Sequence, residues 1–99
     1  MFLDRYKIDI ANLCNQNKVK TLYVFGSVLT DKFNDMSDID LVVDIESDDP
    51  IEYADNYFNL KFALQDLLKR QIDLLESKAI KNPYILQSID NSKSLIYGL

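Results

Sequence analysis

The stretches VFGS, at residues 24–27, and SDIDLVV, at residues 37–43, decide the fold of this chain of 99 residues. Each holds a run of apolar, β-forming side chains, so each predicts a buried strand, one over 21–25 and one over 39–45. The first strand stops at a glycine and the second is entered through an aspartate. Between them, residues 27–36 are polar and irregular, with one helical turn expected just after the glycine.

Helical patterns flank these strands. Residues 2–16 carry apolar side chains at spacings of three and four, which predicts an amphipathic helix with Cys14 as a small buried hydrophobe. Residues 47–50 (SDDP) supply capping side chains and a proline suited to the first helical position. A second helix is therefore expected over about 51–69.

A third strand and a last helix complete the expected order. Residues 71–75 (QIDLL) are typical of a strand, and the apolar residues of 84–96 indicate a helix. The alternation of helix, strand, loop, strand, helix, strand and helix predicts an α/β fold, a small mixed sheet flanked by helices. The length fits one domain over residues 1–99.

Composition excludes several classes of function. The chain has no histidine and one cysteine, which rules out an intrachain disulfide, zinc sites built on Cys and His, and histidine-dependent catalytic triads. Its net charge of −5 argues against a surface that binds nucleic acid. An acidic protein can still bind a nucleotide if a divalent cation neutralises the phosphates. No signal peptide or membrane-spanning run is apparent, so we expect a cytoplasmic protein without membrane contact.

Three aspartates are candidate metal ligands. Asp38 and Asp40 stand two positions apart at a strand entrance, so their side chains point to the same face. Neighbouring carboxylates repel each other unless something positive lies between them, and Mg²⁺ prefers oxygen ligands. Asp73 interrupts an apolar strand and would complete a three-carboxylate cluster if the two strands are neighbours. Taken singly, each of these aspartates can also be a solvated acid at a strand end. Three further acids are interpreted as solvated: Asp44, Glu46 and Glu76.

The glycine turn is a candidate phosphate-binding element. Gly26 lets the backbone approach a ligand closely, and the Ser27 hydroxyl with nearby N–H groups can hold a phosphate oxygen, although such turns are often purely structural. Gly-Ser followed, twelve positions after the glycine, by Asp-x-Asp resembles the signature of the DNA polymerase β-like nucleotidyltransferase superfamily. Residues 72–74 resemble its third acidic strand. The small size is similar to the minimal nucleotidyltransferase (MNT) branch.

This resemblance implies a polymerase β-like fold and a two-metal Mg²⁺ site with ATP as the substrate. It implies nucleotide binding by three residues: Gly26, Ser27 and Ser37. It also implies that Asp38 and Asp40 hold the metal that binds the triphosphate, while Asp73 holds a second and helps to deprotonate the attacking hydroxyl. Family members often carry arginine just after Gly-Ser. Here residues 28–31 are VLTD and Lys32 is the first base, which leaves open how the triphosphate charge is offset.

Members of the MNT branch are commonly antitoxins that transfer AMP to a hydroxyl, typically of a tyrosine, on a partner HEPN-type RNase toxin. The resemblance thus implies a protein adenylyltransferase with a nucleoside triphosphate and a HEPN-type toxin as partners, and assembly into a homodimer or a hetero-oligomer stays open. One alternative is a non-catalytic binding module that neutralises a partner by covering it. Another is a small-molecule nucleotidyltransferase of the aminoglycoside type, which usually carries a further helical domain.

Overall fold

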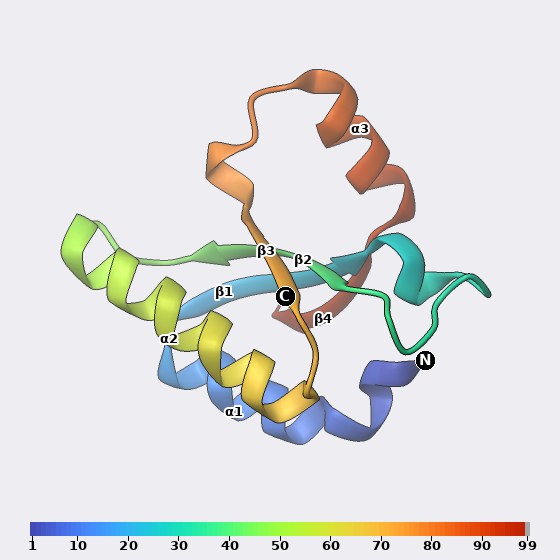
Figure 1. Ribbon diagram of the computed structural model, residues 1–99. Helices are drawn as coiled ribbons and strands as arrows, with labels where there is room; N and C mark the ends of the chain where they lie inside the picture. Colours follow the sequence, from blue (N-terminus) through green and yellow to red (C-terminus); the bar gives the residue numbers. More distant parts are fainter. Residues whose placement is uncertain (99) are drawn as a thin grey trace.

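The computed structural model describes residues 1–98 and shows a four-stranded mixed sheet with helices on both faces (Figure 1). The strand order is β3-β2-β1-β4, where β1 is antiparallel to both of its neighbours and β2 is parallel to β3. The elements are η1 (Phe2–Tyr6), α1 (Lys7–Gln16), β1 (Val19–Phe25), η2 (Gly26–Leu29), β2 (Ile39–Ile45), α2 (Pro50–Leu68), β3 (Ile72–Glu76), η3 (Ser77–Ala79), α3 (Pro83–Ser92) and β4 (Ser94–Gly98). The expected mixed sheet flanked by helices is confirmed.

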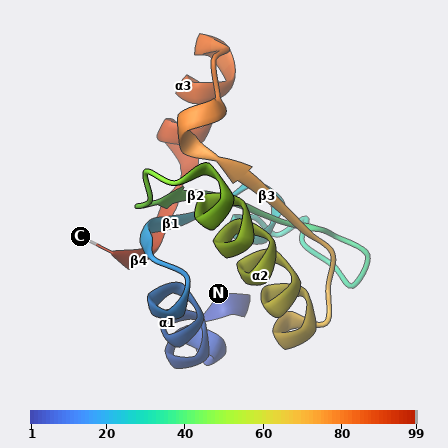
Figure 2. The same ribbon diagram turned by 90° about the vertical axis from the view of Figure 1, so that its left-hand side faces the viewer.

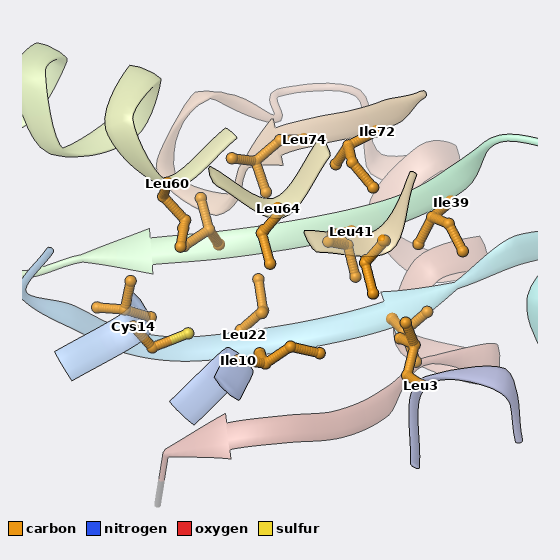
Figure 3. Packing of buried hydrophobic residues seen from close by; sticks show 14 of the residues in the cluster. Leu3, Ile10, Cys14, Leu22, Ile39, Leu41, Leu60, Leu64, Ile72 and Leu74 are labelled. Atoms are coloured by element: carbon orange, nitrogen blue, oxygen red, sulfur yellow. The ribbon is translucent and has the colours of Figure 1, made fainter. Parts of the chain in front are cut away.

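One face of the sheet is apolar and closed by α1 and α2. Strand side chains alternate between faces, so every second residue of β1, β2 and β3 points toward these two helices. Leu22 of β1 and Leu60 and Leu64 of α2 are fully buried and meet in the centre of this layer (Figure 3). Burial of each such side chain contributes about 1.5–3 kcal/mol. This layer holds the sheet together, and the other face carries the polar residues.

Helix α2 begins and ends as the sequence predicts. The Asp49 carboxylate accepts a hydrogen bond from the N–H of Ile51 at 2.9 Å, and Pro50 occupies the first turn. The helix stops at Lys69, which takes a left-handed conformation with φ of 57°. Midway along it, the Tyr57 hydroxyl donates to the Leu74 carbonyl at 2.5 Å. This bond ties α2 to β3 and so helps to place β3 beside β2.

Helix α3 lies on the opposite face and covers it only in part (Figure 2). Asn82 caps it by accepting from the N–H of Tyr84 at 2.9 Å, and Ile89 is 5% exposed. Between α3 and the sheet is a hollow of about 200 Å³ that reaches Tyr23 of β1 and Val42 of β2. None of the helices within residues 1–98 is both long and apolar enough to cross a membrane.

The prediction of a helix over 84–96 is wrong at its C-terminal end. The helix stops at Ser92, Lys93 is extended with ψ of 149°, and Ser94–Gly98 form strand β4 along β1. The free edge of β1 presents N–H and C=O groups that need partners, and β4 supplies them. Apolar spacing alone did not reveal this requirement. At the other terminus the predicted helix over 2–16 is confirmed, although its first five residues form a tighter 3-10 turn.

Candidate active site

The parallel pairing of β2 with β3 brings two of the predicted site residues together. Asp40 and Asp73 are direct partners in the register, flanked by the pairs Ile39 with Ile72 and Leu41 with Leu74. The apolar neighbours point into the core, so both aspartates project from the face that carries α3. Asp38 stands two positions before Asp40, at the entrance to the strand. The expectation that the strand of Asp73 lies beside the strand of Asp40 is confirmed.

The three carboxylates act on one another electrostatically. Burial raises the pKa of Asp40 above its ordinary value, and the negative charges of Asp73 and then Asp38 raise it further. Asp40 is partly buried, whereas Asp38 and Asp73 are exposed. Asp73 interrupts an apolar strand as predicted, and strand alternation turns its side chain outward between the buried Ile72 and Leu74. Among the ion pairs formed by residues 1–98, none involves these three aspartates.

Gly26 lies directly against the Asp40 carboxylate. It follows Phe25, the register partner of Asp40, and has φ of +82°, a left-handed conformation that side chains other than glycine rarely adopt. A Cβ at this position would lie 2.3 Å from Oδ2 of Asp40. Glycine is therefore required twice here, once for the backbone turn and once for the space that the carboxylate occupies.

The turn after Gly26 holds Ser27 at the same edge of the sheet. Residues Gly26–Leu29 form one 3-10 turn, as the sequence predicts, and Val28 anchors it in the core at 7% exposure. The Ser27 carbonyl accepts two hydrogen bonds from Thr30, one from its N–H at 2.9 Å and one from its hydroxyl at 2.8 Å. The backbone of Ser27 is thereby fixed one residue from the glycine that touches Asp40.

Arg70 clamps the loop that leads into Asp38, a role that sequence reasoning missed. Its Nη1 donates to the carbonyls of Asn34 at 2.7 Å and Ser37 at 3.0 Å. Its guanidinium lies over the rings of Phe33 and Phe2, with 4.3 and 4.8 Å to the ring centroids. The side chain is 13% exposed. No local pattern could reveal this clamp, since its partners come from two distant parts of the chain.

Ser37, expected to bind the nucleotide, takes part in the loop itself. Its hydroxyl oxygen accepts from the N–H of Asn34 at 3.1 Å, and its own N–H donates to the Asn34 carbonyl at 3.1 Å. The two bonds close a turn just before Asp38. Ser37 therefore sets the direction in which the chain enters β2.

The opposite end of β2 and β3 carries a second group of acids, which differs from the first. Asp44 is 20% exposed and pairs with Lys78, whose Nζ lies 3.2 Å from its carboxylate and also donates to the Ile45 carbonyl at 3.3 Å. The interpretation of Asp44 as a solvated acid is thus wrong. Glu76 is partly buried and also departs from that interpretation, whereas Glu46 is exposed as expected.

The residues at the first end suit a hard divalent cation. Asp38, Asp40 and Asp73 offer only carboxylate oxygens, the ligands that Mg²⁺ prefers, and their charges are not offset by a cation of the chain within residues 1–98. The carboxylates do not form a preformed metal site, since over the described residues no three acidic side chains are gathered closely enough for one. Mutual repulsion of like charges favours such separation.

Comparison with known proteins shows to which family this chain belongs. The family model described as "Polymerase beta, Nucleotidyltransferase" matches residues 9–99. Two proteins of Methanocaldococcus jannaschii, to which protein adenylyltransferase activity is ascribed, are similar in sequence. MJ0128 is 41% identical over 81 residues, covering 81% of this chain and 76% of the relative. MJ0126 is 36% identical over 80 residues, with the same coverage of 81% and 76%.

Solved structures share the fold. A structure described as a minimal nucleotidyltransferase has a TM-score of 0.76 at 24% identity, covering 93% of this chain and 90% of that one. A toxin-antitoxin crystal structure with AMP-PNP has a TM-score of 0.72 at 24% identity, with coverage of 98% and 75%. A tri-AMPylated Shewanella oneidensis HEPN toxin in complex with MNT antitoxin has a TM-score of 0.68 at 22% identity, with coverage of 100% and 74%. With its family model, its relatives and this fold, the chain belongs to the polymerase β nucleotidyltransferase family.

Proposed function

We propose that this protein is an Mg²⁺-dependent protein adenylyltransferase that moves AMP from ATP to a tyrosine hydroxyl of a HEPN-type toxin, and so acts as its antitoxin. The observation that carries the proposal is the register pairing of Asp40 with Asp73 beside the Gly26 turn. The adenylyltransferase activity ascribed to the relatives supports the reaction. The likeness to toxin-bound MNT antitoxins supports the partner. In this proposal residues 1–99 form one catalytic domain.

The acids divide the metal-binding role by position. Asp38 and Asp40, at the entrance of β2, would hold one Mg²⁺ at the triphosphate, and Asp73 of β3 would help to hold a second at the acceptor hydroxyl. Such ions neutralise charge on the transferred phosphoryl group and stabilise the attacking and leaving oxygens. Burial and then its acidic neighbours raise the pKa of Asp40. The ionised carboxylates are therefore stabilised when a cation binds beside them.

The chain's own residues then orient the reaction. Gly26 and the backbone of Ser27 approach the phosphates, because the turn that holds them lies against Asp40. The acceptor oxygen attacks the α-phosphorus, the bond from that phosphorus to the β-phosphate oxygen breaks, and pyrophosphate leaves. The proton of the acceptor hydroxyl passes to the Asp73 carboxylate, which is exposed and can release it to solvent.

The test is AMP transfer to a HEPN-domain protein encoded beside this chain. The purified pair is incubated with Mg²⁺ and ATP, and the intact mass of the toxin is measured. We expect a gain of one or more AMP units, mapped to tyrosine by peptide mass spectrometry. Asp73→Asn is expected to abolish the gain. Asp44→Asn is the matched control, because it makes the same change at the opposite end of the β2–β3 pair, outside the site, and should leave transfer intact.

Two outcomes would contradict the proposal. If the toxin mass does not change although the folded pair forms a complex, the protein is not its adenylyltransferase. If Asp40→Asn and Asp73→Asn variants neutralise the toxin as well as the unaltered protein does, neutralisation comes from covering the toxin rather than from catalysis. The growth of cells that express the toxin with each variant reports the second outcome.

A further inference from the structure

A triphosphate brings more negative charge to the site than the glycine turn can offset. Residues 28–31, just after Gly26 and Ser27, contain no base, and Asp31 adds a negative charge. Arg70 is near the loop, but its guanidinium is enclosed by Phe2 and Phe33 and already donates to two carbonyls. A cation from another element of the fold can supply the positive charge that residues 28–31 lack.

Lys93 lies at the same end of the sheet as the glycine turn. It precedes Ser94, the first residue of β4, and Ser94 pairs with Val24, two residues before Gly26. Its Nζ is 4.3 Å from the centroid of the Tyr23 ring and 2.9 Å from the Asp90 carboxylate. The side chain is 30% exposed, so its ammonium group is held in place and still reaches solvent.

The register also places Lys93 on the same face as the aspartates. Tyr23, under the lysine, pairs with Val42, and Phe25 pairs with Asp40. Tyr23 and Phe25 are two residues apart on one strand and share a face, which is the face from which Asp40 projects. The pair beneath Lys93 is thus one step, ~6.6 Å along the strand, from the pair that contains Asp40. A chain of phosphates that starts at Asp40 can span such a distance.

We propose that Lys93 binds the triphosphate of the nucleotide and supplies the positive charge that the turn after Gly26 lacks. The proposal rests on the function proposed above. A lysine ammonium carries three hydrogen-bond donors at the end of a flexible side chain, so it can bind phosphate oxygens as a point charge. Without the nucleotide, the Asp90 carboxylate accepts a hydrogen bond from this ammonium group. When the nucleotide binds, a phosphate replaces the carboxylate as the partner of the lysine.

A purely structural role for Lys93 makes a different prediction. If the lysine only secures the end of α3, then Asp90 is its working partner, and loss of either residue should harm the protein in the same direction. If the lysine binds phosphate, Asp90 competes with the nucleotide and adds repulsion. Substitution of the two residues should then change nucleotide affinity in opposite directions.

The experiment is calorimetric titration of the full chain with Mg²⁺-ATP, with no acceptor present. Lys93→Met keeps the aliphatic stem over Tyr23 and is expected to weaken binding about 10- to 100-fold, the effect of losing a charge-assisted contact. Lys93→Arg should recover most of the affinity. Asp90→Asn should tighten binding about 2- to 5-fold. Lys32→Met, which removes the first base of the loop, is the matched control and should bind as the unaltered chain does.

The outcomes separate the two proposals. Unchanged affinity in Lys93→Met, or weakening by Lys93→Met and Asp90→Asn alike, overturns the role of Lys93 and leaves the function standing, provided that Asp40→Asn abolishes binding. A folded chain that does not bind Mg²⁺-ATP at all, or binds it equally well after Asp40→Asn, overturns the proposed function and with it this inference. Thermal unfolding of each variant confirms that it is folded.

Discussion

The two ends of the β2–β3 pair carry acids on neighbouring strands, yet they differ in how the chain treats them. At one end Asp44 is mostly buried and paired with Lys78. At the other, Asp40 and Asp73 stand side by side, and no cation within residues 1–98 pairs with either. Gly26 lies against Asp40 at that end and keeps any side chain out of the space beside it.

An acidic cluster therefore indicates a metal site only when its carboxylates have no cationic partner within the protein. A carboxylate that already has a lysine partner is stabilised little by a metal ion, whereas one whose pKa is raised by burial and then by its acidic neighbours is stabilised more. The cations also serve different purposes. Lys78 pairs with the Asp44 carboxylate, whereas Arg70 holds the backbone of a loop and lies 3.8 Å from the exposed Asp35 rather than beside the three site aspartates. Variants that change one end of the β2–β3 pair at a time test this difference.

The largest expected effect comes from the substitution of Asp73, with Asp44 as the comparison at the other end of the strands. Asp73→Asn should lower the rate of AMP transfer by about 100- to 1,000-fold, the usual loss when one group that stabilises the transition state is removed. Asp44→Asn should leave the rate unchanged. Steady-state kinetics with labelled ATP measures both. Equal losses in the two variants would remove the distinction between the ends.

The next largest effect on activity is expected from substitution of Gly26, the glycine that lies against Asp40. Gly26→Ala adds a Cβ that must displace the Asp40 carboxylate, so activity should fall about 10- to 100-fold. Stability should fall by about 1–2 kcal/mol, because φ is positive. Gly98→Ala is the control: its φ is also positive and its Cβ would meet the Lys20 carbonyl at 2.2 Å. It should destabilise the fold while the remaining folded protein keeps its kcat.

The two cations provide a third test, read mainly in stability. Arg70→Met removes two charge-assisted hydrogen bonds in a site that is 13% exposed and should lower the free energy of unfolding by about 2–3 kcal/mol. Transfer should slow as well, because the loop leads into Asp38. Lys78→Met should cost about 1 kcal/mol with no loss of activity. Urea unfolding monitored by circular dichroism measures the stability of each variant, and kinetics measures its activity. A larger loss of stability in Lys78→Met than in Arg70→Met would contradict the prediction.

The smallest effect concerns pH. The folded-state pKa of Asp40 lies above its ordinary value of 3.8, chiefly through burial and then through Asp73 and Asp38. The folded protein therefore binds more protons than the unfolded chain, and this contribution to stability is present below pH 3.8 and lost as the pH rises through the raised pKa. Asp40→Asn should raise Tm at neutral pH by about 1–5 °C without divalent cations.

Asp44→Asn should not raise Tm in this way, since its partner Lys78 would be left unpaired. Added Mg²⁺ should stabilise the unaltered protein and not the Asp40→Asn variant, because a ligand stabilises only the state that binds it. Thermal scans between pH 4 and pH 7 test both statements. A Tm of the Asp40→Asn variant at or below that of the unaltered chain would contradict the raised pKa of Asp40.

Much of the fold could be predicted because it depends on local patterns. The strand runs around Gly26 and Asp40, the helix that begins after the capping residues 47–50, and the strand of Asp73 each depend on a few neighbouring residues, and the structure confirms each. Strand β4 was missed because the apolar residues after Ser92 fit a helix as well as a strand. Only the unpaired edge of β1, far away in the sequence, decides between them.

The sequence alone predicted the candidate site residues, a glycine turn and three aspartates near two strand entrances, and their pattern resembles the family whose model matches residues 9–99. The pairing of the acids follows from the tertiary structure, since Lys78 of one segment reaches Asp44 of a distant strand and Arg70 reaches Asp35. The tertiary structure also decided that Lys93 shares a face with Asp40. Such contacts depend on strand order and register, and the free energy that selects them comes from burying the whole core rather than from any short segment.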